Sequence, residues 1–154
     1  MRQEDEKRKR LDDLLKNQKL AVLATHSDGQ PYGNLVFFAA GPDSKEILFA
    51  TYRSTRKYAN LTSNPRVAML IDSRAHLDSD IHQAMAVTAT GVVDEPLPGE
   101  MTGCRRIYLE KLPHLSDFVE NEDCALLRLK VQAYHLVDRF QDVTTLQTED
   151  WAGE

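Results

Sequence analysis

The sequence has 154 residues, the length of one domain that can bury a full core without disulfide or metal support. Hydrophobic residues make up 42% and charged residues 28%, and this composition excludes a disordered or fibrous chain. Lysine and arginine number 19 against 24 aspartates and glutamates, a formal net charge of −5. That balance disfavours nucleic-acid binding through bulk positive charge and leaves room for no more than a local basic patch.

The N-terminal segment and the cysteines narrow the class further. The first ten residues are mostly charged and have no apolar segment behind them, so we expect no secretion signal. No run approaches the roughly 18 apolar residues of a transmembrane helix, so no membrane partner is expected. Cys104 and Cys124 are too few for a disulfide framework and lack metal-ligand spacing. We therefore expect a soluble cytoplasmic protein.

The first forty residues predict a helix and a β-hairpin. Leu11, Leu14 and Leu15 form one apolar stripe of a helix expected over residues 8–19. Asp28-Gly29 predicts a tight turn between two strands, because glycine tolerates positive φ. A hairpin near the start of the chain follows from these two signals.

A short helix interrupts the strands that come next. Ser54 or Thr55 can cap its start, and Asn64-Pro65 should end it, since the residue before proline avoids the α region. The four strands of this half are expected at residues 20–25, 32–40, 46–51 and 66–72.

The second half predicts a loop, further strands and peripheral helices. A polar stretch over residues 73–83 has no clear period and predicts a long loop. The later elements are expected as a strand at 84–93, helices at 101–112 and 115–120, and one or two strands within 125–137. Five or six antiparallel strands favour a closed or partly closed barrel, because closure removes exposed sheet edges. The expected fold class is therefore mainly β with peripheral helices (α+β).

The most informative segment is the third strand and the turn after it. Phe49-Ala50-Thr51 ends the strand, and Thr55-Arg56-Lys57 opens the short helix. Helix N-termini present unpaired N–H groups and the positive end of the dipole, so they bind phosphate well. Thr55 adds a hydroxyl donor, Arg56 a planar fork and Lys57 a compact charge. The residues alone leave two interpretations open, a monophosphate site or a solvated, well-capped helix start.

Other recognisable chemistry is missing from the sequence. The seven glycines form neither a dinucleotide fingerprint nor a P-loop, and there is no G-x-S-x-G elbow. The five histidines are scattered, and His76 and His82 have poor spacing for zinc. No metal site is expected, and the two cysteines are expected to be inert packing residues.

The order of motifs carries a family resemblance. An apolar strand and an Asp-Gly-Gln-Pro turn come first, and the segments that follow are Leu48-Phe49-Ala50-Thr51, Thr55-Arg56-Lys57, Asn60-Leu61 and Asn64-Pro65-Arg66-Val67-Ala68. This order resembles the pyridoxamine 5′-phosphate oxidase-like family over residues 20–72, and an Ala-Val-Thr-Ala-Thr-Gly strand extends the match to about residue 93. The resemblance implies a six-stranded antiparallel split β-barrel of the FMN-binding type.

The resemblance also implies which residues bind the cofactor. Thr55, Arg56 and Lys57 match the family's Ser/Thr-Arg-Lys motif, which holds the FMN phosphate. Ala50 and Thr51 lie on the strand before it, where Thr51 matches a position that commonly contacts the flavin.

The second strand and a partner chain are implied to complete the site. The strand usually lines the isoalloxazine edge with its backbone, here from Asn34, Leu35, Val36 and Phe37. Many members have arginine at the position of Asn34, so one phosphate or ribityl contact differs in this chain. Family members are usually homodimers with FMN at the interface, and the region around Gln83 is expected to reach the partner's flavin.

The implied function is an FMN-dependent oxidoreductase with an unknown substrate or electron donor, in which the cofactor supplies the redox chemistry. No catalytic residue can be named, because hydride transfer to a flavin requires no particular side chain. The alternative is a non-catalytic protein on the same fold that stores or senses FMN or another planar cofactor. Relatives include deazaflavin users and haem proteins, and His114 or His135 would be the haem ligand.

A true pyridoxamine 5′-phosphate oxidase is not expected. Such oxidases resemble one another in a lysine five residues after the arginine that aligns with Asn34, and here that position is Ala39. They also carry an Arg/His-bearing C-terminal segment over the flavin, whereas residues 144–154 contain three acids and no base follows Arg139. Repulsion there would disfavour an anionic substrate, so a neutral or cationic substrate, or none, is expected.

Overall fold

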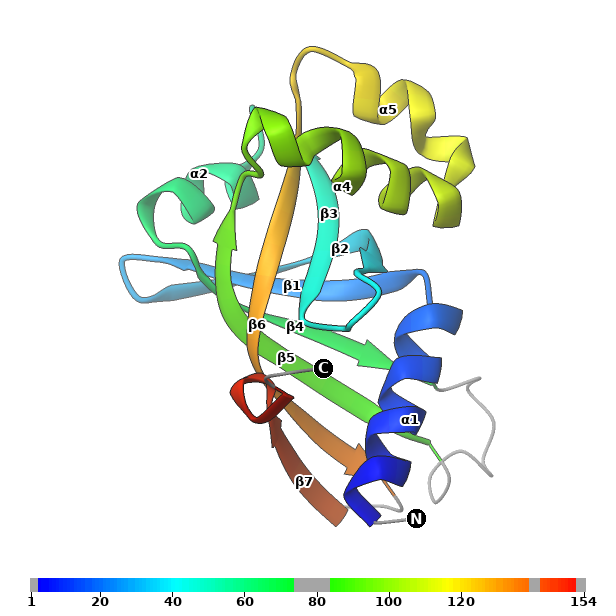
Figure 1. Cartoon of the computed structure of the whole chain (residues 1–154). Coiled ribbons are helices and arrows are strands. Elements are labelled where there is room, and N and C mark those ends of the chain that lie inside the picture. The colour runs from blue at the N-terminus through cyan, green and yellow to red at the C-terminus, as the bar shows by residue number, and fades with distance from the viewer. Residues whose placement is uncertain (1–2, 74–83, 139–141, 152–154) are drawn as a thin grey trace.

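The computed structural model describes residues 3–73, 84–138 and 142–151, and the loop expected over residues 73–83 lies outside these ranges except for Ser73. The described strands form one antiparallel sheet of order β3-β2-β1-β4-β5-β6-β7, and a further pairing of β3 with β6 closes the first six into a barrel (Figure 1). The strands are β1 (Leu20–Ser27), β2 (Gln30–Ala40), β3 (Glu46–Tyr52), β4 (Arg66–Asp72), β5 (Ala86–Asp94), β6 (Cys124–Asp138) and β7 (Asp142–Gln147). The expected six-stranded antiparallel barrel with peripheral helices is confirmed.

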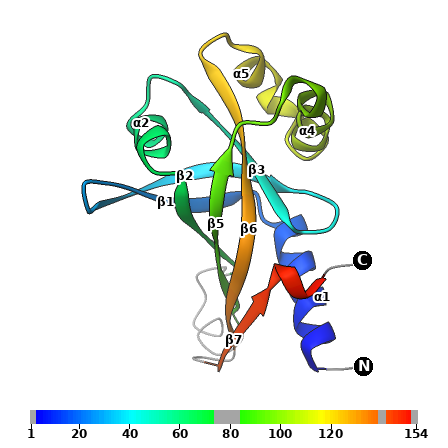
Figure 2. The ribbon, with the colours of Figure 1, turned by 60° about the vertical axis from the view of Figure 1, so that its left-hand side comes forward.

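Helices lie around the barrel and do not enter it. They are α1 (Gln3–Asn17), α2 (Arg56–Ser63), α4 (Pro98–Lys111) and α5 (Ser116–Glu120), with short 3-10 turns η1 (Pro113–Leu115) and η2 (Thr148–Trp151). Figure 2 shows β5 and β6 running along the molecule, with α4 and α5 at one end and β7 at the other. The expected stripe of Leu11, Leu14 and Leu15 is buried and packs α1 on the barrel.

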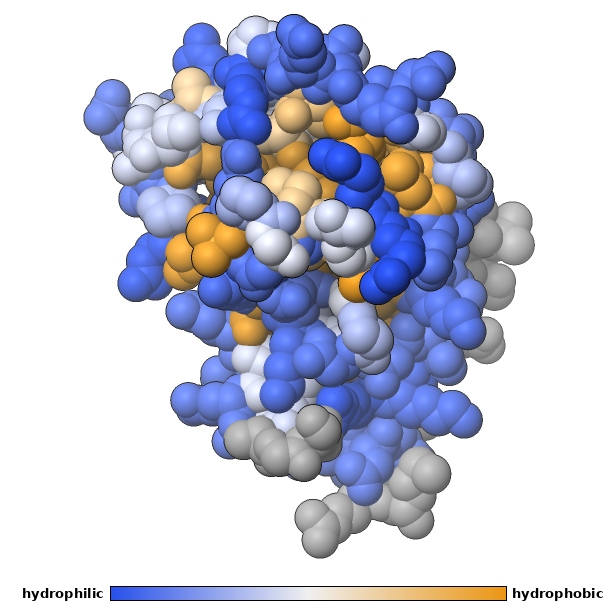
Figure 3. Space-filling view, turned by 45° about the horizontal axis from the view of Figure 1, so that its top comes forward, coloured by the Kyte–Doolittle hydropathy of each residue, from blue (hydrophilic) through white to orange (hydrophobic). Residues whose placement is uncertain are grey.

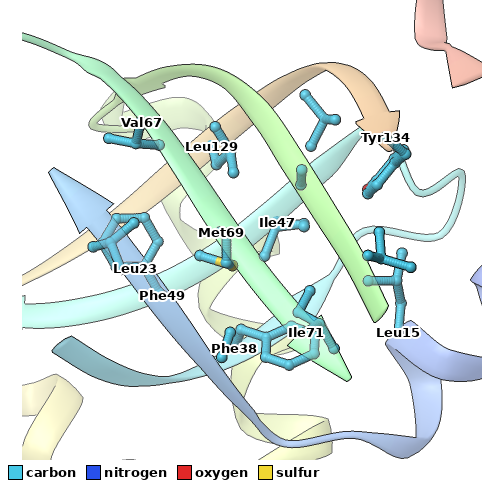
Figure 4. Packing of buried hydrophobic residues seen from close by; sticks show 14 of the residues in the cluster. Leu15, Leu23, Phe38, Ile47, Phe49, Val67, Met69, Ile71, Leu129 and Tyr134 are labelled. Carbon is cyan, nitrogen blue, oxygen red and sulfur yellow. The ribbon is translucent and has the colours of Figure 1, made fainter. Parts of the chain in front are cut away.

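Two apolar clusters hold the layers together. Inside the barrel, alternate residues of its six strands point inward and meet, as Figure 4 shows for Leu23, Phe49, Met69 and Leu129. A second cluster, which includes Leu48 and other residues outside the barrel, lies between the sheet and helices α4 and α5. Strand β3 is therefore buried on both faces, which explains its unbroken apolar run.

The barrel is split along part of β2. This strand pairs with β1 from Gln30 to Phe37, but it pairs with β3 only from Phe38 to Ala40. The hairpin turns at Asp28-Gly29, as predicted, with both φ angles positive. Figure 1 shows the hairpin extending sideways from the barrel. The split thus leaves one edge of β2 unpaired along residues 30–37.

Several expected boundaries were wrong. Helix α1 begins at Gln3, and α4 begins at Pro98, where proline suits the first helical turn and the Glu100 side chain accepts from the Leu97 N–H at 3.2 Å. The region 125–137 is a single strand, which is one of the two alternatives expected, and β7 was not predicted. Trp151 is buried and stacks on Tyr134, with ring centroids 6.0 Å apart.

Candidate functional site

Helix α2 starts where β3 leaves the barrel. Thr55 is the N-cap: its backbone is extended, and its hydroxyl accepts from the Tyr58 N–H at 3.3 Å. The same hydroxyl donates to the Tyr52 carbonyl at 2.8 Å and lies 2.9 Å from the Thr51 hydroxyl. The expected cap is confirmed, and this hydroxyl is already engaged in holding the turn. The N–H groups of Arg56 and Lys57, in the first turn, have no carbonyl within the helix to bond.

Arg56 and Lys57 place two cations at this helix start. The Arg56 side chain is exposed and that of Lys57 is half-buried. Neither side chain has an ion pair or hydrogen bond with any part of the chain that the structure describes. Burial lowers the pKa of Lys57, because a partly desolvated ammonium is less favourable than the neutral amine. An anion is the partner that such a pair lacks.

The residues just before the helix anchor this turn on both sides. Arg53 donates to both carboxylate oxygens of Glu95 at 2.9 and 3.1 Å and to the Tyr58 hydroxyl at 2.7 Å. These hydrogen bonds, Glu95 first, raise the pKa of Arg53 above its ordinary value. Ser54 donates to the Asp123 carboxylate at 2.9 Å, and the Arg53 N–H bonds the Asp123 carbonyl. This anchoring has no signal in the local sequence, because Glu95 and Asp123 are far from Arg53 and Ser54 along the chain.

Helix α2 bridges the split. Its start follows β3, and Asn60 near its other end donates to the Thr25 hydroxyl on β1 at 3.0 Å. Both of these polar side chains are buried, and Leu61 packs into the barrel core. The helix therefore connects the end of β3, on one side of the split, with the β1–β2 hairpin on the other.

The predicted site residues of β2 differ in how they are oriented toward the split. Val36 points into the core, whereas Leu35 and Phe37 lie on the outer face. Because the Phe38 N–H bonds the Lys19 carbonyl beside β1, alternation directs the backbone groups of Leu35 and Phe37 to the open edge. The Phe37 carbonyl there accepts from the Tyr108 hydroxyl at 3.0 Å. Asn34 is half-buried, and its Oδ1 is buried with no hydrogen-bond partner in the described structure.

The remaining predicted residues divide into two groups. Thr51 is only 1% exposed, and Ala50 lies under α4 in the outer cluster. Both residues are therefore buried, and they support the turn before α2 by packing beneath it. Gln83 lies outside the described residues.

An exposed apolar face adjoins the open edge of β2. It consists of Leu20, Val22, Leu35, Phe37 and Leu70, which are 38–64% exposed. Register makes it continuous: Leu20 is opposite Phe37, and Val22 is opposite both Leu35 and Leu70. At the margin of this apolar face, the exposed His114 ring meets the Phe37 ring edge-on, with centroids 6.1 Å apart.

Figure 3 views the end that carries α4 and α5. Apolar side chains lie in the middle of that surface, and hydrophilic side chains surround them. Across the described ranges, no three His, Cys, Asp or Glu side chains are grouped as metal ligands. None of the helices described is long and apolar enough to span a membrane.

Comparisons with known proteins agree with this architecture. A family model described as pyridoxamine 5′-phosphate oxidase matches residues 8–138. A pyridoxamine 5′-phosphate oxidase homolog of Schizosaccharomyces pombe is 27% identical over 157 residues, covering 81% of this chain and 82% of the relative.

Two solved structures illustrate the likeness of fold. A haem-binding protein from Mycobacterium smegmatis has a TM-score of 0.80 and 18% identity, covering 90% of this chain, and the chain spans 57% of that protein. An FAD-binding protein from Mesorhizobium loti has a TM-score of 0.69 and 19% identity, covering 84% of this chain and 90% of that one. At these identities, the similarity establishes the fold alone.

These features define an antiparallel split barrel with a cationic helix start beside the split. The chain belongs to the pyridoxamine 5′-phosphate oxidase family, whose fold is the FMN-binding split barrel. The resemblance carried by the motifs is confirmed, over a longer stretch than the motifs themselves cover.

Proposed function

We propose that this chain binds FMN in the split, with the phosphate at the start of α2, and that it is an FMN-dependent oxidoreductase. The observation that carries the proposal is the pair Arg56 and Lys57, two cations at a capped helix N-terminus that form no ion pair with the described residues. Proteins of the family typically bind flavin, and some relatives bind haem. When bound, FMN would supply the redox chemistry.

The residues present fit a flavin phosphate. The free N–H groups of the first turn of α2 and the Arg56 fork suit phosphate oxygens, and Lys57 adds charge in a partly desolvated position. The open edge of β2 offers the Leu35 and Phe37 N–H groups to the planar ring, which has acceptors along one side. The orphaned Asn34 Oδ1 is an acceptor that lacks a donor. This chain's part is thus to bind and orient the cofactor.

We propose a homodimer in the cytoplasm, with the flavin site at the interface. The apolar face lies directly beside the split, and a second copy would cover both. The region around Gln83 of each chain would then reach the partner's flavin. The unpaired thiols of Cys104 and Cys124 accord with a reducing compartment.

The substrate is proposed to be neutral or cationic rather than a pyridoxine phosphate. Ala39 is buried under α4 and offers no charge to a second phosphate. Residues 142–151 contain acids and no base. The FMN-loaded protein should not oxidise pyridoxamine 5′-phosphate; turnover with a micromolar KM would contradict this proposal.

Haem binding is a second candidate function, and His114 favours it. The imidazole is exposed at the margin of the apolar face, and neither of its ring nitrogens has a hydrogen-bond partner in the described ranges. His135 is less suited, because its Nδ1 lies 3.1 Å from the Thr145 hydroxyl.

The absorption spectrum of the purified protein, followed by titration with FMN and with haemin, distinguishes these candidates. We expect saturable FMN binding and reduction of the bound flavin by NADH or NADPH. Saturable haemin binding that His114→Ala abolishes, without any FMN binding, would replace the flavin proposal with the haem one. FMN binding without reduction by any donor would indicate storage or sensing.

A further inference from the structure

A cavity of about 610 Å³ lies between helix α1, helix α4 and the β2–β3 turn. Its volume is in the range of small-molecule sites. None of the residues that line it belongs to the proposed flavin site. A ligand bound there would therefore be independent of the flavin proposal.

The cavity is lined mainly by apolar residues, and small ones keep it open. Leu15 comes from α1 and Ile107 from α4, and Ala39, Ala40 and Gly41 follow one another at the end of β2. These last three have little or no side chain, so they leave space that larger residues would fill. This apolar floor suits a ligand with a large apolar body.

Side-chain hydrogen bonds hold the wall at the β2–β3 turn. Ser44 is buried and has a φ of 59°, in the left-handed region that few residues other than glycine adopt. Its hydroxyl donates to the Asp12 carboxylate at 2.7 Å, and its carbonyl accepts from the Tyr134 hydroxyl at 2.7 Å. The shape of this wall is thus fixed before any ligand binds, which lowers the entropic cost of binding.

Four charged side chains line the cavity, one acid and one base from each helix. Asp12 and Lys16 come from α1, and Glu110 and Lys111 come from α4. Their formal charges cancel, so the lining as a whole favours neither an anion nor a cation. A ligand with a net charge would be repelled by one pair of these side chains, whereas a zwitterion would be attracted by both pairs.

Two of the four already have partners in the protein. The Asp12 carboxylate is held by the turn, and the Lys111 ammonium donates to two carbonyls at the end of α1. Lys16 and Glu110 form no ion pair or hydrogen bond, with each other or with any other residue that the structure describes. Two opposite charges on different helices are therefore available to a ligand in one cavity.

The helix dipoles make Glu110 the less favourably placed of these two. Lys16 lies in the last turn of α1, where a cation offsets the negative end of the dipole. Glu110 lies in the last turn of α4, where the dipole disfavours a carboxylate. The ammonium group of a ligand would supply a counter-charge at this point.

We propose that this cavity binds a free α-amino acid with a large apolar side chain. The ammonium group of the amino acid pairs with Glu110, and its carboxylate pairs with Lys16. Its side chain packs on the apolar floor. As a zwitterion, it adds no net charge to a lining that has none.

Calorimetric titration of the full-length protein with three ligands of similar apolar body tests the proposal. L-phenylalanine carries both charges, phenethylamine only the cation and hydrocinnamate only the anion. We expect saturable binding of phenylalanine, at least about threefold tighter than that of either analogue, because each analogue lacks one ion pair at a solvent-accessible site. No saturable binding of phenylalanine, or binding of either analogue as tight as that of phenylalanine, would overturn the proposal.

Two charge variants should have complementary effects. Glu110→Gln should remove the preference for phenylalanine over hydrocinnamate and keep the preference over phenethylamine, and Lys16→Gln should do the reverse. Both side chains are exposed, so the fold should persist. Lys9→Gln, at an exposed lysine of α1 outside the cavity, is the control and should change neither preference. Unchanged preferences in the two cavity variants, or the same change in all three variants, would contradict the assigned ion pairs.

A variant that fills the cavity tests the location of the ligand. Ala40→Leu places a larger side chain at the apolar floor and should abolish phenylalanine binding, with circular dichroism preserved. Full phenylalanine affinity in a folded Ala40→Leu would show that the amino acid binds elsewhere and would overturn the proposal. If Ala40→Leu does not fold, the charge variants still decide, because they change only exposed side chains.

Discussion

The position of Lys57 lowers the stability of the ligand-free protein and would suit a bound anion. It is half-buried, and burial holds its pKa below the ordinary value. A lysine whose folded pKa is lowered costs folding free energy while it is charged. That penalty is fully present at neutral pH and fades only as pH rises through its pKa. A bound phosphate would remove it by supplying the missing counter-charge.

Lys57→Met should therefore separate stability from binding. We expect the free energy of unfolding without ligand, from urea titration at pH 7, to stay the same or rise. FMN affinity should fall about tenfold or more, since a charge-assisted hydrogen bond is worth about 1.5–3 kcal/mol. Lys130→Met, at an exposed lysine of β6, is the control and should leave FMN affinity unchanged. A less stable variant with intact FMN affinity would show that Lys57 is a structural residue.

Local signals in the sequence predict the caps and turns of this site but not its long-range contacts. The Thr55 cap and the Asp28-Gly29 turn depend on neighbouring residues, so both could be predicted and are confirmed. The pairing of Arg53 with Glu95 joins residues 42 positions apart and depends on how the barrel closes. No periodicity or motif encodes such a contact.

The backbones of strands β5 and β6 approach each other very closely at Gly91. Their register shifts between Thr90 and Gly91, and a Cβ on Gly91 would lie 2.0 Å from the Lys130 carbonyl oxygen. That neighbour is backbone in a central strand, so it cannot move aside without breaking the ladder. Gly91 is therefore required by this close approach of two strands.

Gly91→Ala should cost at least about 3 kcal/mol of unfolding free energy, because overpacking here displaces backbone rather than a flexible side chain. Gly99→Ala in α4 is the matched control, since nothing lies within 4 Å of its added Cβ. It should leave stability unchanged or raise it by up to about 1 kcal/mol through helix propensity. Chemical denaturation of both variants measures the difference, and equal stabilities would contradict the close-packing account.

A network around Arg128 ties the start of α4 to the barrel. Arg128 on β6 is buried and donates to Asp94, at 2.9 and 3.0 Å, and to Glu100. Its hydrogen bonds hold the pKa of both carboxyls below their ordinary values. Acids with lowered pKa contribute stability above their unfolded pKa, and that contribution is lost as pH falls through the folded pKa.

The network should thus make the barrel acid-sensitive. For Asp94, whose unperturbed pKa is 3.8, the loss falls below that pH. We expect the unfolding free energy of the wild type to drop between pH 4 and pH 2.5 by more than that of Asp94→Asn. Asp117→Asn, which changes an exposed acid on α5, should follow the wild type. If the unfolding free energies of all three proteins fall in parallel as pH is lowered, Asp94 does not cause the acid sensitivity.

Strong periodicity made most elements predictable, and its absence explains the omission of β7. Strand β5 shows a strict alternation of buried and half-buried residues, the period of two that is typical of a strand. In β7, Leu146 alone is buried, so its sequence has no alternating apolar signal. That strand exists because β6 offers it an edge, and this depends on the tertiary structure.

At the scale of the whole molecule, the apolar face and the split lie side by side. Leaving five large apolar side chains exposed on adjoining strands is costly for a monomer in water. A second copy that covers them would also enclose the ring of a flavin bound along β2. The proposed dimer and the proposed cofactor site therefore depend on one surface.

Leu70→Lys should convert the proposed dimer to a monomer, because a desolvated ammonium within the covered apolar face is strongly unfavourable. Light scattering after size exclusion should give 17.5 kDa for the variant and twice that for the wild type. Val143→Lys, at an exposed apolar residue of β7, is the control and should remain dimeric. A wild type that is monomeric while retaining FMN would contradict the shared-site proposal.

The most direct test of the account compares the affinities of FMN and riboflavin for the wild type and Arg56→Ala. Riboflavin lacks the phosphate, so it isolates the contribution of the helix start. We predict that Arg56→Ala weakens FMN binding about 10- to 150-fold and leaves riboflavin binding unchanged, with circular dichroism preserved. Arg105→Ala, at an exposed arginine of α4, should change neither affinity. Equal affinity of Arg56→Ala and wild type for FMN, or an equal loss for FMN and riboflavin, would contradict the assignment of the phosphate to α2.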